Sequence, residues 1–305
     1  MARTTLLPES SRRPSVADAH GAMALSHRLP RLALEARRVS AFVNGVHGRR
    51  RPGPGETFWQ YRTLTPGEPA SGIDWRRSGR DNRVYVRERE WEASHTVWLW
   101  VDRSASMGFS SALAQAPKID RAIVLGLALA DALVDAGERV GLLGLTRPYA
   151  SRRVIEQLIE NMAIDESGLS ADLPPPRAVA QLDEAILISD WLTPIDSILQ
   201  RLAVVGAGGG RGHLVMIVDP VEETFPFSGQ AELRDPEDGL RLDVGDAAAW
   251  GEEYRARIAA HRGALQENCR KLGWTFTLHR TDRAASEPAL KVASLVASAR
   301  GARAA

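Results

Sequence analysis

The feature that most constrains the fold is an alternation of strand-type and helix-type segments that runs from about residue 94 to residue 300. The strand-type segments are short β-branched or apolar runs, and we expect them at residues 96–101, 139–145, 185–189, 213–218 and 274–279. Helical apolar spacing follows at residues 119–137, 152–162, 194–206, 247–273 and 287–300. This order predicts a doubly wound α/β domain, with a mostly parallel sheet covered by helices on both faces.

The first 93 residues differ in character from this domain. Residues 1–20 are polar and contain two prolines, which indicates a disordered tail. We expect residues 21–55 to form a helical segment and a linker rich in Arg, Gly and Pro, and residues 56–93 to form a small β-rich segment, followed by the main domain at 94–300. Pro30 is expected to break the helical segment. Its expected apolar anchors are Leu32, Leu34, Val39 and Phe42.

Composition excludes several classes of protein. The chain has 39 Lys and Arg against 38 Asp and Glu, so a net charge of +1 argues against a globally basic nucleic-acid binder. The charge is uneven, because residues 1–55 carry +7 and the remainder −6. The longest apolar run, residues 122–130, is far shorter than the ~20 residues that span a membrane, and no signal-peptide pattern opens the chain. With Cys269 as its one cysteine, the protein is expected in the reducing cytoplasm.

Acidic residues directly follow three of the expected strands, as Asp102, Asp190 and Asp219. The carboxyl ends of the strands of a doubly wound sheet share one edge, where such folds bind ligands. After the first strand, Asp102, Ser104 and Ser106 alternate, so one turn can direct a carboxylate and two hydroxyls to one point. Oxygen ligands without Cys or His suit Mg²⁺. The sequence therefore predicts a Mg²⁺ site formed by Asp102, Ser104, Ser106 and Asp190 that stays open to an outside carboxylate.

Each of these residues also has a structural interpretation. Asp or Ser at a loop-to-helix junction caps the helix, which accounts for one residue of the first loop but not for three that alternate. Asp190 fits a turn in which Thr193 caps the next helix. We favour the metal site for Asp102 and Asp190. Asp219, which precedes Pro220, fits a turn residue better than a ligand.

The Asp-x-Ser-x-Ser-Met-Gly stretch at residues 102–108, with Ile-Ser-Asp at 188–190, resembles the metal-ion-dependent adhesion site of von Willebrand factor A domains. Motifs on both sides narrow the resemblance to the bacterial family catalogued as domain of unknown function 58. These motifs are Tyr61-Arg62, Pro66-Gly67-Glu68, Ile73-Asp74-Trp75-Arg76, Arg80, VYVREREWE at 84–92, Asp219-Pro220, Phe225-Pro226, Gly229 and Arg234-Asp235. The resemblance covers roughly residues 45–280. It implies a von Willebrand factor A-like, Rossmann-like fold.

Two departures from the pattern concern the metal site and the upstream motif. Fuller adhesion sites carry a Thr from a loop between the second strand and Asp190, whereas residues 165–176 contain none, so Ser167 or Ser170 is the nearest hydroxyl substitute. Many family members also have an Arg shortly before the Ile-Asp-Trp motif, where this chain has Ser71 and Gly72.

These patterns favour a non-catalytic protein-interaction module over an enzyme, because no base or nucleophile accompanies the acidic set. Family members are often encoded beside MoxR-type AAA+ ATPases, so the resemblance implies such an ATPase or its client as partner, and an adaptor or chaperone-like role. One alternative is a Mg²⁺-dependent phosphohydrolase that uses Asp102, although haloacid-dehalogenase-like phosphatases have a second Asp where this chain has Ser104. A weaker alternative is nucleic-acid binding by the Arg-rich N-terminus, which lacks a recognition motif.

Overall fold

The computed structural model describes six stretches of the chain. They are residues 16–46, 58–64, 73–80, 83–89, 95–234 and 240–301. The chain divides into two compact units, of which the larger comprises residues 1–48 with 95–305 and the smaller residues 49–94.

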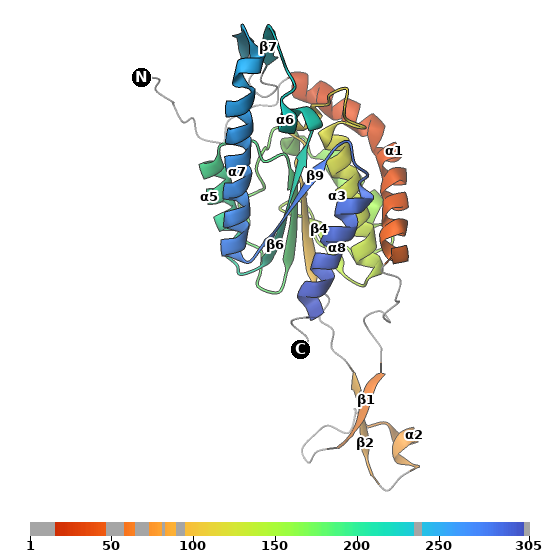
Figure 1. The fold of residues 1–305 in the computed structure, drawn as a ribbon. Coiled ribbons are helices and arrows are strands. Elements are labelled where there is room, and N and C mark those ends of the chain that lie inside the picture. Colours follow the sequence, from red (N-terminus) through yellow and green to blue (C-terminus); the bar gives the residue numbers. More distant parts are fainter. Residues whose placement is uncertain are drawn as a thin grey trace. The chain divides into compact units, whose positions relative to one another are not determined.

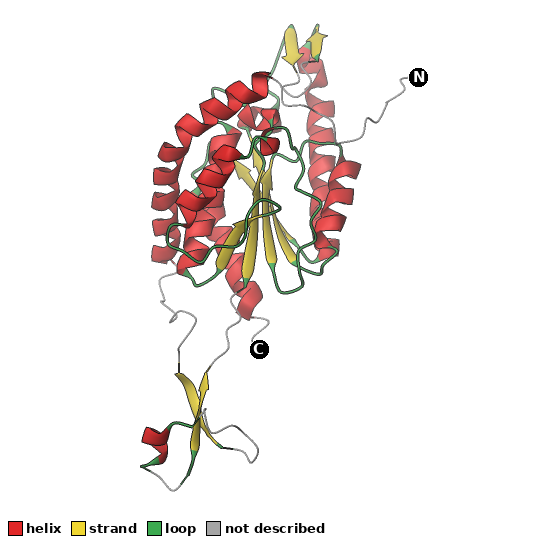
Figure 2. Cartoon of the chain, turned by 180° about the vertical axis from the view of Figure 1, so that it is seen from behind, coloured by secondary structure: helices red, strands yellow, loops and turns green. Residues whose placement is uncertain are grey.

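The larger unit is built around one five-stranded sheet. Its strands are β3 (Thr96–Val101), β4 (Arg139–Leu142), β5 (Glu184–Ser189), β6 (Arg211–Val218) and β9 (Thr275–Arg280). They lie in the order β4-β3-β5-β6-β9, and every neighbouring pair is parallel. Helices cover both faces of this sheet, as the two opposite views show (Figures 1 and 2). The predicted doubly wound α/β architecture is therefore confirmed.

The helices of this unit divide between the two faces. They are α1 (Val16–Val46), α3 (Lys118–Asp135), α4 (Val154–Ile164), α5 (Ile195–Gly206), α6 (Pro220–Thr224), α7 (Gly251–Leu272) and α8 (Ser286–Gly301), with short 3₁₀ turns η2 (Ala105–Gly108), η3 (Ser167–Leu169) and η4 (Ala247–Trp250). Because side chains alternate along a strand, Val97 and Leu99 pack with the core of α1, α3, α4 and α8, whereas Trp98 and Trp100 pack with that of α5 and α7.

Helix α3 is buried on nearly all of its sides. Its apolar residues from Ile119 to Val134 are all among the buried core side chains. One face of α3 lies on the sheet and α1 packs against it, which explains why its sequence is apolar all round. No described helix has both the length and the apolar character needed to cross a membrane.

Helix α1 corrects two expectations about the front of the chain. It runs without a break through Pro30, which lies on the exposed side, where water can satisfy the carbonyl that the proline leaves without a donor. Leu34 and Phe42 are 63% and 52% exposed, so they are not anchors, although Leu32 is buried as expected and Val39 packs against the core. The buried face of α1 consists of Leu29, Leu32, Ala36, Ser40 and Val43.

Polar contacts also fix α1 to the domain. Arg28 pairs with Asp120 of α3 at 2.7 Å, and Arg37 pairs with Glu156 of α4. Part of the positive charge near the N-terminus is thus matched by acidic residues of the same unit. The helix begins at Val16, inside the segment expected to be disordered, while residues 1–15 and the linker at 47–57 lie outside the described stretches.

The sequence patterns did not predict a small hairpin, which lies near α7 at the top of Figure 1. It consists of β7 (Ala231–Arg234) and β8 (Arg241–Val244), which are antiparallel. The hairpin has its own small core, in which Phe225, Val244 and Ala247 are buried and Tyr254 stacks on Phe225. Its strands are four residues each and mostly polar, so they carry little periodic signal.

The smaller unit contains an antiparallel pair and one short helix. Strand β1 (Phe58–Thr63) pairs with β2 (Tyr85–Arg89), with a register shift between Phe58 and Gln60. Helix α2 (Trp75–Ser78) is capped by Asp74, whose carboxylate accepts a hydrogen bond from the backbone N–H of Arg77. The acidic residue of the Ile-Asp-Trp motif therefore has a local structural role.

We predict that Leu32→Ala lowers the free energy of unfolding by about 2–4 kcal/mol, because it leaves a cavity between α1 and the core. Leu34→Ala is the matched control on the same helix, and its exposed position predicts a change within about 0.5 kcal/mol. Urea denaturation of both variants measures the difference. Equal losses from the two substitutions would show that α1 does not dock through this face.

A second prediction concerns His279 on β9. Burial and the positive charge of Arg121 lower the pKa of His279 from 6.5 to about 4, although the negative charge of Asp282 acts in the opposite direction. Between these two pH values the ring is neutral in the folded chain and protonated in the unfolded chain. Stability present above pH 6.5 is therefore lost as the pH falls toward 4, by up to about 3 kcal/mol. Unfolding measured between pH 7 and 4 should show a flatter profile for His279→Asn. Parallel profiles for the two proteins would contradict this assignment.

Candidate functional site

The site lies where the strand order of the sheet reverses. Strand β3 has β4 on one side and β5 on the other, so the chain winds outward in both directions from this point. Val101 at the end of β3 is in register with Ile188 near the end of β5. Asp102 and Asp190 therefore leave two adjacent parallel strands at the same edge. A crevice at such a switch point is the usual ligand site of doubly wound sheets.

The structure brings Asp102 together with the other residues of its loop and with β5. The Asp102 carboxylate accepts hydrogen bonds from the Ser104 backbone N–H at 2.8 Å and from the Ser189 hydroxyl at 2.6 Å. The Ser104 and Ser106 hydroxyl oxygens are 3.2 Å apart. Ser104 makes no side-chain cap to the 3₁₀ turn that follows, so capping does not account for its position. The predicted convergence within this loop is thus present.

Asp102 is almost completely buried, and its charge is only partly compensated. Burial, and after it the negative charge of Asp190, raise the pKa of Asp102 to about 7, although hydrogen bonds from Ser189 and Ser104 act in the opposite direction. Asp190 follows β5, the strand that pairs with β3, and the Asp102 backbone N–H donates to the Ile188 carbonyl of that strand at 2.9 Å. A cation between or beside the two carboxylates would relieve their repulsion.

Lys118, which the sequence reasoning missed, already supplies one positive charge. Its ammonium is 1% exposed and donates to Asp190 Oδ2 at 2.8 Å and to Glu222 Oε1 at 2.5 Å. Burial alone would lower the pKa of Lys118, but Asp190 and Glu222 together raise it above its usual value. A weak signal for it was available, because only three of the 39 basic residues are Lys and one of them is the first residue of a largely apolar helix.

Asp219 has the structural role that the sequence favoured. It caps α6, because its carboxylate accepts a hydrogen bond from the Val221 backbone N–H. The Glu222 carboxylate in turn accepts one from the Asp219 backbone N–H, which completes a capping box. The second carboxylate oxygen of Asp219 accepts the Ser111 backbone N–H at 2.8 Å. Asp219 thereby ties the loop after β3 to α6 and helps to hold Glu222 against Lys118.

The remaining hydroxyls near the loop before β5 form bonds other than those considered from the sequence. Ser167 donates to Asp165, and Ser170 donates to the Ser167 carbonyl, so both bond locally. Thr193 donates to Asp172 at 3.1 Å and does not cap α5, whose N-cap residue is Pro194. The predicted cap by Thr193 is therefore wrong, whereas Asp190 does form a turn, because its Oδ1 accepts a hydrogen bond from the Leu192 backbone N–H at 3.2 Å.

The residue types at this edge fit a divalent cation. Asp102, Asp190, Ser104 and Ser106 offer only oxygen donors, and the burial of the incompletely neutralised Asp102 carboxylate is the observation that favours a cation. Among the described residues there is no cluster of three or more His, Cys, Asp or Glu suited to a metal. A cation here would therefore depend on the serine hydroxyls as well as on the two carboxylates.

We predict that Lys118→Met lowers the free energy of unfolding by about 3–5 kcal/mol, because Asp190 and Glu222 lose their buried cation. A triple variant that adds Asp190→Asn and Glu222→Gln removes all three charges and should recover most of this loss. Urea unfolding at pH 7 tests both proteins. A single variant as stable as the wild type would rule out a structural role for this ion pair.

Two solved structures show a weak likeness to the chain. One is the conserved hypothetical protein BatB from Bacteroides thetaiotaomicron, with a TM-score of 0.40 and 15% identity, covering 67% of this chain and 100% of that one. The other is an aerotolerance-related membrane protein from Bacteroides fragilis, with a TM-score of 0.37 and 14% identity, covering 66% of this chain and 99% of that one.

Sequence comparison finds relatives in mycobacteria. Uncharacterized proteins of Mycobacterium bovis and Mycobacterium tuberculosis are 26% identical to this chain over 261 residues, which cover 81% of this chain and 81% of each relative. The family described as protein of unknown function DUF58 matches residues 60–264, which include β3, its serine loop and Asp190. Because this match spans more than half of the sequence, the chain belongs to the DUF58 family.

Proposed function

We propose that this chain is a non-catalytic protein-interaction module that holds a carboxylate of a partner protein through Mg²⁺. Asp102, Ser104, Ser106 and Asp190 would hold the ion in an arrangement of the von Willebrand factor A adhesion type. The carrying observation is that the loop after β3 brings the Asp102 carboxylate and the Ser104 and Ser106 hydroxyls together, while Asp190 follows the adjacent parallel strand at the same edge of the sheet. When bound, Mg²⁺ would supply an electrophilic centre for a partner's carboxylate.

The chain's own residues would orient and balance this site. Ser189 and the Ser104 backbone N–H hold the two oxygens of Asp102, so its carboxylate has little freedom to turn. Lys118 neutralises one of the other two nearby carboxylates, Asp190 and Glu222, so the site keeps a net negative charge that attracts a divalent ion. The positive ion would then attract an acidic partner.

The surface around this edge also suits a protein partner. Phe109 and Leu113, in the loop that follows β3, are 40% and 57% exposed. Leu192, two residues after Asp190, is 39% exposed. Apolar side chains beside a polar centre are typical of protein-binding surfaces. They support an interaction role more than a role in binding a small, fully charged substrate.

The partner that we propose is a MoxR-type AAA+ ATPase or its client, with the chain acting as adaptor or chaperone-like assembly factor in the cytoplasm. The sequence resemblance supports this partner and this role. The cytoplasmic location is proposed from the single cysteine of the chain, Cys269, whose thiol is buried and whose pKa burial raises to about 12. A thiol of this kind stays in its inert protonated form. The ion pairs of Arg28 and Arg37 within the domain weaken the alternative of nucleic-acid binding by this region.

We predict that Asp102→Ala reduces Mg²⁺ affinity by at least about tenfold and abolishes Mg²⁺-dependent capture of the partner. Calorimetric titration measures the ion, and affinity purification from native cells, with the ATPase held in its ATP state, measures capture. Asp196→Ala removes an exposed carboxylate of α5 and is the matched control, which should behave as wild type.

Two outcomes would contradict the proposal. Equal recovery of the partner with and without a chelator would exclude the metal mechanism. Mg²⁺-dependent turnover of a generic phosphate ester that disappears in Asp102→Asn would replace the interaction module by the phosphohydrolase alternative. Circular dichroism of each variant confirms that the fold is retained.

A further inference from the structure

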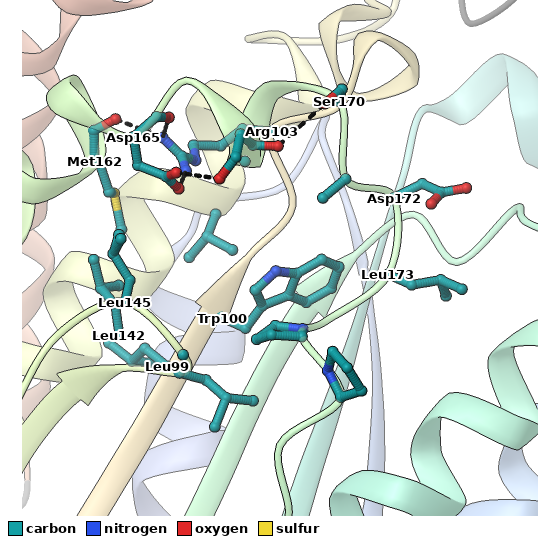
Figure 3. Close-up of a pocket in the computed structure, with 18 of the residues that line it drawn as sticks. Leu99, Trp100, Arg103, Leu142, Leu145, Met162, Asp165, Ser170, Asp172 and Leu173 are labelled. Carbon is teal, nitrogen blue, oxygen red and sulfur yellow. Dashed lines mark hydrogen bonds and ion pairs between the residues drawn. The ribbon is translucent and has the colours of Figure 1, made fainter. Parts of the chain in front are cut away.

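A cavity of about 920 Å³ adjoins the loop that carries Asp102 (Figure 3). Its size is that of a ligand pocket. The walls come from the end of β3, the loop after β4 and the loop before β5, and most of them are apolar. Labelled apolar side chains around it include Leu99, Trp100, Leu142, Leu145, Met162 and Leu173. A pocket of this composition accepts an apolar group.

The pocket lies where the edge of the sheet is incomplete. The register of β3 with β4 ends at the pair Leu99 and Leu142, and the Leu143 backbone N–H donates to the Leu99 carbonyl at 2.7 Å. Strand β3 continues through Trp100 and Val101, which are in register with β5 only. Both residues line the cavity. An extended segment of another chain can therefore enter where β4 would have continued, as peptides do when they add to a sheet edge.

The charges that line the cavity are balanced. Arg103 is 6% exposed and donates to the Met162 carbonyl and to Asp165 Oδ2, each at 2.5 Å (Figure 3). Arg201 and Asp172 also line the cavity, and so the lining contains two arginines and two aspartates. A ligand group that enters this space is therefore better uncharged than charged.

Two of the loops that line the cavity contact each other at Gly144 and Pro175. Gly144, in the loop after β4, has a φ of 78°, and a Cβ added there would come within 2.7 Å of Pro175 in the loop before β5. The two loops thus touch at this point. A side chain larger than glycine at residue 144 would therefore have to displace Pro175, which lines the same cavity.

Arg103 connects this cavity to the candidate metal site, because its backbone stands between Asp102 and Ser104 while its side chain lines the cavity. We propose that the pocket binds a bulky apolar side chain, such as Leu or Phe, on an extended peptide segment of the partner. An acidic residue of the same segment would be bound by the Mg²⁺ ion that Asp102 and Asp190 hold. The acidic part of this assignment rests on the proposed function. The apolar part depends on the cavity alone.

The test uses the full chain labelled with ¹⁵N and three capped amino acids, N-acetyl-leucinamide, N-acetyl-phenylalaninamide and N-acetyl-glycinamide, with a chelator present. The first two should give saturable shifts of amide signals from residues 142–145 and 165–173, and the glycine compound should give none. Leu145→Glu puts a charge on the apolar wall at a position 41% exposed, so it should weaken binding about ten- to a hundredfold. Leu182→Glu, at an exposed leucine outside the cavity lining, is the matched control and should leave binding unchanged.

A second arm adds Mg²⁺ and a capped peptide that contains both Asp and Leu, which should bind more tightly than either residue alone. Binding of the capped leucine without any effect of Mg²⁺ supports the pocket and contradicts the proposed function. Shifts that do not saturate, or that Leu145→Glu leaves unchanged, overturn the pocket assignment even where the Mg²⁺ effect persists.

Discussion

Burial of α3 between the sheet and α1 is the constraint on which both the fold and the candidate site depend. One face of α3 covers β3 and β5, and α1 covers much of the rest, so its apolar residues are shielded from water. The first residue of the same helix, Lys118, then points its ammonium at Asp190 and Glu222. The packing of this apolar helix thereby places the Lys118 ammonium beside Asp190, at the carboxyl edge of the sheet. Without α1, one side of α3 would be exposed and this arrangement would lose its support.

The electrostatics of the edge follow from this geometry. Parallel strands deliver Asp102 and Asp190 to one place, and burial makes their repulsion costly. Lys118 relieves the repulsion at Asp190, while Asp102 has only hydroxyl and amide donors. The edge therefore combines a buried ion pair, which stabilises the fold, with an incompletely neutralised carboxylate, which suits a ligand. Ser189 orients Asp102 and also accepts a hydrogen bond from the Trp191 backbone N–H, so it ties the Asp102 carboxylate to the turn after β5.

The apolar cavity beside this edge gives the chain a means of selecting partners that charge alone lacks. A metal-held carboxylate is a feature that many acidic partners share, whereas a shaped apolar pocket distinguishes side chains by size. Arg103 lies at the junction of the two, and Asp165 neutralises it there. Strand β4 ends before β3 does, and the cavity lies where β3 has no strand on its β4 side. The incomplete sheet edge and the proposed binding pocket therefore have the same cause.

Local pattern in the sequence was sufficient to predict the alternating strands and helices, the parallel sheet and the acidic residues at its carboxyl edge, because backbone periodicity and strand ends are properties of short segments. The loop of Asp102, Ser104 and Ser106 belongs to this predictable part. Tertiary structure decided which face of α1 is buried, against the predicted anchors Leu34 and Phe42, because that face depends on where α3 lies. It also decided the pairing of Lys118 with Asp190 and Glu222, since residues 72 and 104 positions apart meet only through the strand order. A single lysine forms no periodic pattern in the sequence, and so Asp190 and Glu222 can be identified as its partners only from the assembled sheet.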